Sequence, residues 1–114
     1  MVRNRLATSR REGRVEFLGE QDGPAERELK AMLEVELKRF SSVQRAYLAR
    51  VGFAPDAEIS IALSIAPSAA NRKEIVEVVH RTFSSLFETA AHLDILFPDE
   101  QQEIDLQRVC RSFL

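Results

Sequence analysis

The sequence has few of the residues that make covalent cross-links or metal sites. Its 114 residues include one cysteine, Cys110, two histidines and no tryptophan. A single cysteine excludes an intrachain disulfide and any metal site built from several cysteines. No apolar run approaches the roughly 20 residues that span a bilayer, and the N-terminus lacks the apolar segment of a signal peptide. We therefore expect a cytoplasmic protein with no membrane partner.

The chain also has little net charge, with a formal value of −2. Its overall field therefore favours neither nucleic acid nor an anionic membrane. Residues 1–14 nevertheless hold five arginines and one glutamate, a net charge of +4 that leaves −6 for residues 15–114. Because residues 1–14 also lack hydrophobic periodicity, we expect a flexible basic arm there. Weak contact of this arm with nucleic acid or an acidic surface stays open, but no specific nucleic acid is expected.

What the chain does contain is ordinary for a globular domain, with 45% hydrophobic and 30% charged residues. At this length a hydrophobic core forms without help from disulfides or metals. We therefore predict a single domain over residues 15–114.

Hydrophobic spacing predicts the elements of the first half. A short strand is expected at residues 15–18, followed by turn residues at 19–23. A helix is expected from about residue 24 to residue 39. It rests on apolar residues that recur at helical spacing: Leu29, Leu33, Leu37 and Phe40. Alternating patterns at 43–53 and 58–66, joined by a turn at 54–57, predict an antiparallel hairpin.

The second half continues with helix, strand and helix. Ser68 or Asn71 is the expected cap of a helix whose apolar stripe runs from Ile75 to Leu86, and Glu74 stands at capping-box spacing from Asn71. Residues 92–97 predict a further strand. A last helix is expected to begin at Pro98-Asp99. Its apolar face is predicted to hold Leu106, Val109, Cys110 and Phe113.

The resulting order, β-α-β-β-α-β-α, predicts the α+β class. It is typical of a ferredoxin-like split β-α-β arrangement, with helices on one face of an antiparallel sheet and an extra C-terminal helix. The aliphatic side chains of 59–65 should then face the helices. The opposite face is expected to stay uncovered and to carry small side chains and one leucine: Ser60, Ala62, Ser64 and Leu96.

Several segments together match a family pattern. They are Phe17-Leu18-Gly19-Glu20, a helix led by proline, the strand Val43 to Arg50 with Ala46-Tyr47-Leu48 at its centre, and His92-Leu93-Asp94-Ile95. In this order the chain resembles the C-terminal domain of the SseB (enhanced serine sensitivity) family over about residues 17–114. Gln21 stands where that family usually has proline. The resemblance implies a bacterial α+β domain, and it implies no catalytic residues.

The residues with reactive side chains do not form a catalytic or metal-binding pattern. Cys110 falls on an apolar helix face, where a free cysteine is usually a small hydrophobe. His80 and His92 belong to no H-x-x-x-H or H-E-x-x-H motif, and the segment 19–23 lacks both the G-x-G-x-x-G pattern and a Walker lysine. We therefore predict no enzyme, with no catalytic, cofactor-binding or metal-ligating residues.

A noncatalytic interaction or regulatory domain is thus the first functional hypothesis. The expected open face would let a second copy pack closely, which predicts a homodimer through Ser60, Ala62, Ser64 and Leu96. An unidentified protein partner is the variant of this hypothesis. A domain that senses an amino-acid-like metabolite is the alternative, and it is motivated by the family resemblance alone. Tyr47 is expected to be a core aromatic whose hydroxyl reaches a partner.

Overall fold

Each helix and strand that the sequence predicts is present in the computed structural model, which describes residues 2–3, 15–53, 59–67, 70–87 and 91–114. The elements follow the order β1 (Val2–Arg3), β2 (Val15–Glu20), α2 (Pro24–Leu37), β3 (Arg45–Phe53), β4 (Ile59–Ala66), α3 (Arg72–Leu86), β5 (Leu93–Leu96) and α4 (Glu100–Gln107). The α+β class and the order β-α-β-β-α-β-α, counted from β2, are confirmed.

The strand β1 was not expected, because residues 1–14 were predicted to be a flexible arm. Val2 and Arg3 pair in parallel with Leu93 and Asp94 of β5. The arm prediction is therefore wrong for these two residues. Its remaining residues, like the predicted turn at 54–57, lie outside the described part of the chain.

The sheet is mixed, with the strand order β1-β5-β4-β3-β2. The pairs β2–β3 and β3–β4 are antiparallel, whereas β4 and β5 are parallel neighbours joined by α3. The predicted ferredoxin-like antiparallel sheet is therefore wrong, since in that arrangement another strand separates the two parallel strands that a helix joins. Periodicity specifies each strand, but pairing between distant segments decides which strands become neighbours.

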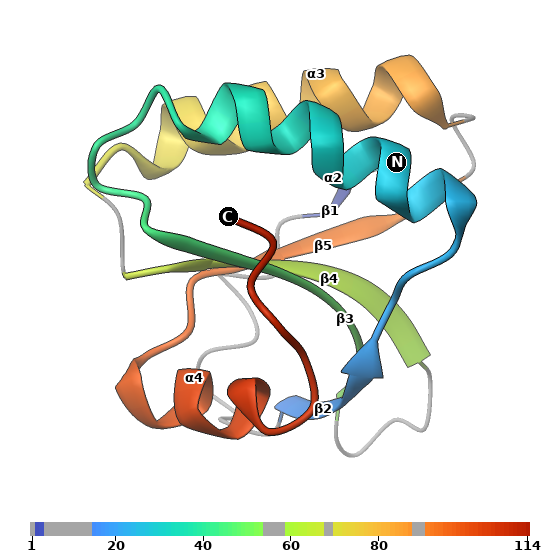
Figure 1. Ribbon diagram of the computed structural model, residues 1–114, viewed down its shortest axis with the longest axis vertical. Coiled ribbons are helices and arrows are strands. Elements are labelled where there is room, and N and C mark those ends of the chain that lie inside the picture. The colour runs from blue at the N-terminus through green and yellow to red at the C-terminus, as the bar shows by residue number, and fades with distance from the viewer. Residues whose placement is uncertain (1, 4–14, 54–58, 68–69, 88–90) are drawn as a thin grey trace.

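The helices α2 and α3 lie side by side over one face of the sheet (Figure 1). Apolar side chains of these helices meet the alternating aliphatics of β3, β4 and β5 and form the main core. Its buried members include Leu29, Leu33, Leu37, Ala46, Leu48, Leu63, Ile65, Ile75, Val79, Phe83, Leu93 and Ile95. As predicted, Leu63 and Ile65 face the helices, but Ile59 is 60% exposed at the start of β4.

The opposite face of the sheet is covered by α4 (Figure 1). Leu106 and Cys110 pack there against Tyr47 and Ala49 of β3. Beside them, Val15 and Phe17 of β2 pack against a second group of buried residues: Val51, Ala62 and Leu96. We call these two adjoining groups the second core. The predicted layout, with helices on one face and the other face open, is wrong for this reason.

The ends of the helices show where the chain passes from one face of the sheet to the other. Asp99 caps α4 by accepting a hydrogen bond from the Gln102 backbone N–H at 2.8 Å, whereas the predicted cap Asn71 makes no side-chain cap bond. The last helix ends at Gln107, earlier than its apolar pattern predicted. The Phe113 N–H donates to the Ala46 carbonyl at 2.9 Å, and Phe113 packs against the main core. The C-terminal segment thus crosses from the α4 side to the α2 side (Figure 1).

Candidate functional site

The predicted interaction face is interior in this structure. Ala62, Ser64 and Leu96 are only 0%, 1% and 6% exposed, and Ser60 is half-buried. The sequence placed them correctly on one face, because Ser64 of β4 pairs with Tyr47 of β3 and with Leu96 of β5. That face is covered by α4 and by β2, so it is not an open docking surface. The prediction failed because it treated α4 as an extra C-terminal helix and did not expect α4 to cover this face of the sheet.

A pocket lies instead between the helix layer and the sheet, on the main-core side. Its volume is about 160 Å³. The floor comes from three neighbouring strands, through Leu48 of β3, Ile61 of β4 and Leu93 of β5. The pocket therefore sits where β4 and β5 begin. Small-molecule sites are typically concave and mostly apolar, and this pocket has both properties.

The two helices supply the walls of the pocket. Leu29 comes from the second turn of α2, and Phe83 comes from the last turn of α3. Phe87, four residues beyond Phe83, lines the pocket as well. The two phenyl rings stack with centroids 4.7 Å apart and an interplanar angle of 15°. Their spacing brings them together at the end of α3, since positions i and i+4 share a helix face.

Two polar side chains line the pocket within the described part of the chain, Glu26 and His92. One carboxylate oxygen of Glu26 accepts from the Gly23 N–H at 3.0 Å, and the other accepts from Gln21 Nε2 at 3.2 Å. These bonds hold the carboxylate in place at the start of α2. His92 is exposed beside the first residue of β5.

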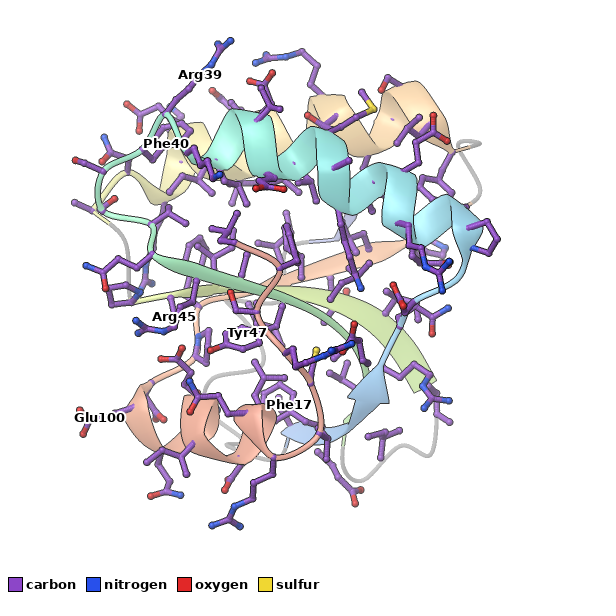
Figure 2. All side chains as sticks on the ribbon, in the orientation of Figure 1. Phe17, Arg39, Phe40, Arg45, Tyr47 and Glu100 are labelled. Atoms are coloured by element: carbon purple, nitrogen blue, oxygen red, sulfur yellow. The ribbon has the colours of Figure 1, made fainter. Side chains whose placement is uncertain are left out.

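A second polar cluster joins α4 to β3 inside the fold. The Tyr47 hydroxyl donates to a carboxylate oxygen of Glu103 at 2.6 Å and accepts from Gln107 Nε2 at 3.0 Å. Arg45 donates to both oxygens of the same carboxylate. Figure 2 shows Arg45 and Tyr47 pointing from β3 toward α4, with Phe17 beside that helix. Tyr47 is thus a core residue whose hydroxyl has partners, as predicted.

Charge and burial set the protonation of this cluster. The hydrogen bonds from Arg45 hold the pKa of Glu103 below its ordinary value, and the Tyr47 hydroxyl acts in the same direction. Burial, together with the ionised Glu103, raises the pKa of Tyr47. A neutral phenol that donates to an ionised carboxylate, itself paired with a guanidinium, is a fully satisfied structural arrangement.

Cys110 is buried in the second core, as its apolar surroundings in the sequence indicated. Its thiol faces the Leu48 carbonyl oxygen, with Sγ 3.5 Å away. Burial raises the pKa of the thiol to about 11. Since the thiolate is the nucleophile, this position disfavours reaction at neutral pH.

A third charged cluster fixes α2 against β2. Lys30 Nζ lies 3.1 Å from Glu20 Oε2 and 3.0 Å from Asp22 Oδ1. Burial alone would lower the pKa of Lys30, but its bonds to Asp22 and Glu20 outweigh that effect and raise it. Arg111, near the C-terminus, also contacts Glu20. This cluster therefore links the middle of α2 to the end of β2 and to the C-terminal segment.

The other residues with reactive side chains are dispersed. His80 is exposed on α3, and Cys110 lies on the opposite side of the sheet from the pocket. Within the described ranges, no group of three or more His, Cys, Asp or Glu side chains is placed to hold a metal ion. Of the candidates considered from sequence, only His92 lies at the pocket.

Sequence reasoning did not identify the pocket. Leu29, Phe83 and Leu93 were predicted as core residues, and they are buried. The space between them depends on how α2 and α3 sit over the sheet, which helical periodicity does not encode. The sequence feature that pointed to the pocket was the spacing of Phe83 and Phe87, because an aromatic pair at the end of a helix lies at the margin of the core.

No family model, curated protein or solved structure matches this chain. None of the helices within the described ranges combines the length and the apolarity needed to cross a membrane.

Proposed function

We propose that this chain is a noncatalytic sensing or regulatory domain that binds a small molecule between α2, α3 and the sheet. The observation that supports it is the pocket of about 160 Å³, whose described lining residues are apolar apart from Glu26 and His92. Pockets for drug-sized ligands measure roughly 300–1,000 Å³, so the ligand here must be small. This proposal develops the metabolite-sensing alternative and keeps the resemblance to the SseB C-terminal domain as an expectation.

A noncatalytic role is supported by the state of the reactive groups. The thiol of Cys110 is buried and its pKa is raised to about 11. Tyr47 and Glu103 use their polar atoms on each other and on Arg45 and Gln107. Groups engaged in this way hold elements together, and catalysis would require them to face a substrate.

Self-association is a second proposal, now placed on a different surface. Met32 and Val35 of α2 are 38% and 61% exposed and lie three residues apart on the side of the helix away from the main core. Residues at this spacing are neighbours on a helix surface. We propose this surface as the contact of a weak homodimer of a cytoplasmic protein, in place of the buried sheet face.

The pocket proposal is tested with an uncharged probe, benzyl alcohol, followed by NMR of the leucine and isoleucine methyl groups. We expect titration to move the methyl signals of Leu29, Leu48 and Leu93, with a dissociation constant on the order of 1 mM for so small a ligand. Ile61→Phe should fill the pocket and weaken binding at least tenfold.

Ile59→Phe is the matched control, since Ile59 lies two residues away on the same strand and is exposed. It should leave binding unchanged. Chemical unfolding of both variants checks that each is folded. Unchanged pocket methyl signals at saturating probe, in a folded wild-type protein, would refute the proposed function.

A further inference from the structure

The charge at the pocket restricts the kind of ligand that fits. Its lining consists of Glu26, Leu29, Leu48, Ile61, Phe83, Phe87, Ala91, His92 and Leu93. With histidine neutral, Glu26 is the one described lining residue that carries a formal charge at pH 7, and the described lining includes no lysine or arginine. A ligand with a cationic group is therefore complementary to this pocket, and an anionic ligand would meet a like charge.

The Glu26 carboxylate retains the capacity to bind a cation. An ionised carboxylate offers about four lone-pair positions. The Glu26 carboxylate accepts two hydrogen bonds, from the Gly23 N–H at 3.0 Å and from Gln21 Nε2 at 3.2 Å. The same two bonds fix the carboxylate before any ligand arrives, and such preorganisation reduces the entropy lost on binding.

The volume and the walls set the apolar part of the ligand. A dry cavity of about 150 Å³ lined by aliphatic and aromatic side chains is known to take up benzene. The present pocket is of similar size, at about 160 Å³, and its walls include Leu29, Phe83 and Phe87. A six-membered ring or a branched chain of similar bulk is the group that such walls accommodate.

We propose that the ligand is a primary amine that carries an aromatic or branched aliphatic group of about the size of benzene. The apolar group fills the space between Leu29, Phe83 and Leu93, and the ammonium group meets the Glu26 carboxylate. This inference rests on the proposed function, because it names the ligand class of the same pocket. It disfavours a free amino acid, whose carboxylate finds no lysine or arginine among the described lining residues.

Three probes with the same ring separate the effects of charge, with the methyl signals of Leu29, Leu48 and Leu93 as the readout. They are 2-phenylethylamine, 3-phenylpropionate and phenylalanine. We expect the amine to bind about two- to fivefold more tightly than either of the others, as one solvent-accessible charge pair allows. Equal or tighter binding of 3-phenylpropionate or of phenylalanine would overturn the inference.

Two charge variants test whether the Glu26 carboxylate causes the preference for the amine. Glu26→Gln removes the charge and keeps the capping box, because glutamine also serves at that position. It should abolish the preference for the amine and leave binding of benzyl alcohol unchanged. Glu28→Gln, an exposed position on the same helix outside the pocket lining, should preserve the preference.

The outcomes distinguish the two proposals. Binding of benzyl alcohol without any preference for the amine refutes the ligand class and leaves the small-molecule function standing. A preference that persists in a folded Glu26→Gln protein also refutes the role of that carboxylate. Failure of all four compounds, benzyl alcohol included, refutes the function itself.

Discussion

The Glu103 carboxylate joins α4 to β3 by accepting three hydrogen bonds. It accepts them from the Arg45 guanidinium and the Tyr47 hydroxyl, although it comes from a different element than either. The glutamate side chain is only 11% exposed. Removing the carboxylate leaves the Arg45 guanidinium without this ionic partner and the buried Tyr47 hydroxyl without this acceptor, which costs more than the net value of the pair.

We therefore predict that Glu103→Gln lowers the free energy of unfolding by about 2 kcal/mol at pH 7. Because the pKa of Glu103 is lowered in the folded protein, its contribution is complete above the ordinary glutamate pKa and disappears as pH falls through the folded value. The difference between variant and wild type should shrink between pH 5 and pH 3, roughly the range where glutamate titrates. Urea unfolding at several pH values measures it.

Glu100→Gln is the control for this experiment, since Glu100 is exposed in the first turn of the same helix. It should change stability by no more than about 0.5 kcal/mol, the usual size of a helix-dipole effect at the surface. A pH-independent loss in Glu103→Gln would contradict the assignment of charge to this carboxylate.

At the level of the elements, α4 covers the face of the sheet that α2 and α3 do not cover. The helix is short, from Glu100 to Gln107, and one side of it is buried through Leu106. An isolated helix of this length is unstable in water, so its structure depends on packing against β3. The polar bonds of Glu103 and the apolar contacts of Leu106 therefore act together to hold it.

Leu106→Ala should reduce the free energy of unfolding by about 2–4 kcal/mol, because Leu106 is fully buried and the cavity cannot fill completely. Ile104→Ala is the matched control on the same helix, where the side chain is 44% exposed, and it should cost less than about 1 kcal/mol. Thermal and urea unfolding give both values. Similar losses in the two variants would show that α4 does not dock in the orientation described.

At the scale of the whole molecule, two cores lie on opposite faces of one sheet, and the exposed apolar side chains are few. Among the described residues, Val35 and Ile59 are the most exposed large hydrophobic side chains, at 61% and 60%. Scattered side chains of this kind are normal on a soluble surface. A stable dimer buries at least about 1,000 Å² in total, far more than Met32 and Val35 provide by themselves.

We accordingly expect self-association to be weak: monomer at about 10 µM and a rising mass near 1 mM, a range that corresponds to a small interface. Light scattering over a concentration series measures it. Val35→Lys should hold the protein monomeric throughout, whereas Ser84→Lys, with the same charge change on α3, should not. If Val35→Lys associates as the wild type does, the contact does not lie on this surface of α2.

Local sequence patterns were sufficient to identify the elements and the inward side of most of them. Helical spacing of Leu29, Leu33 and Leu37 and the alternation along β4 reflect local geometry, so periodicity identifies them without knowledge of the fold. The burial of Cys110 and the role of Tyr47 followed from the same patterns. These features depend on which residues are near in sequence.

The strand order, the packing of α4 on the second face of the sheet and the pocket became known from the three-dimensional fold and not from local patterns. Each depends on pairs that are far apart in sequence: Ala62 with Asp94 in the β4–β5 pairing, Tyr47 with Glu103, and Leu29 with Phe83 at the pocket. A periodic pattern shows that a side chain is buried but does not identify what buries it, because many partners offer similar apolar surface. Ala62 and Leu96 were therefore placed correctly on one face, and only the docking of α4 and β2 made that face interior.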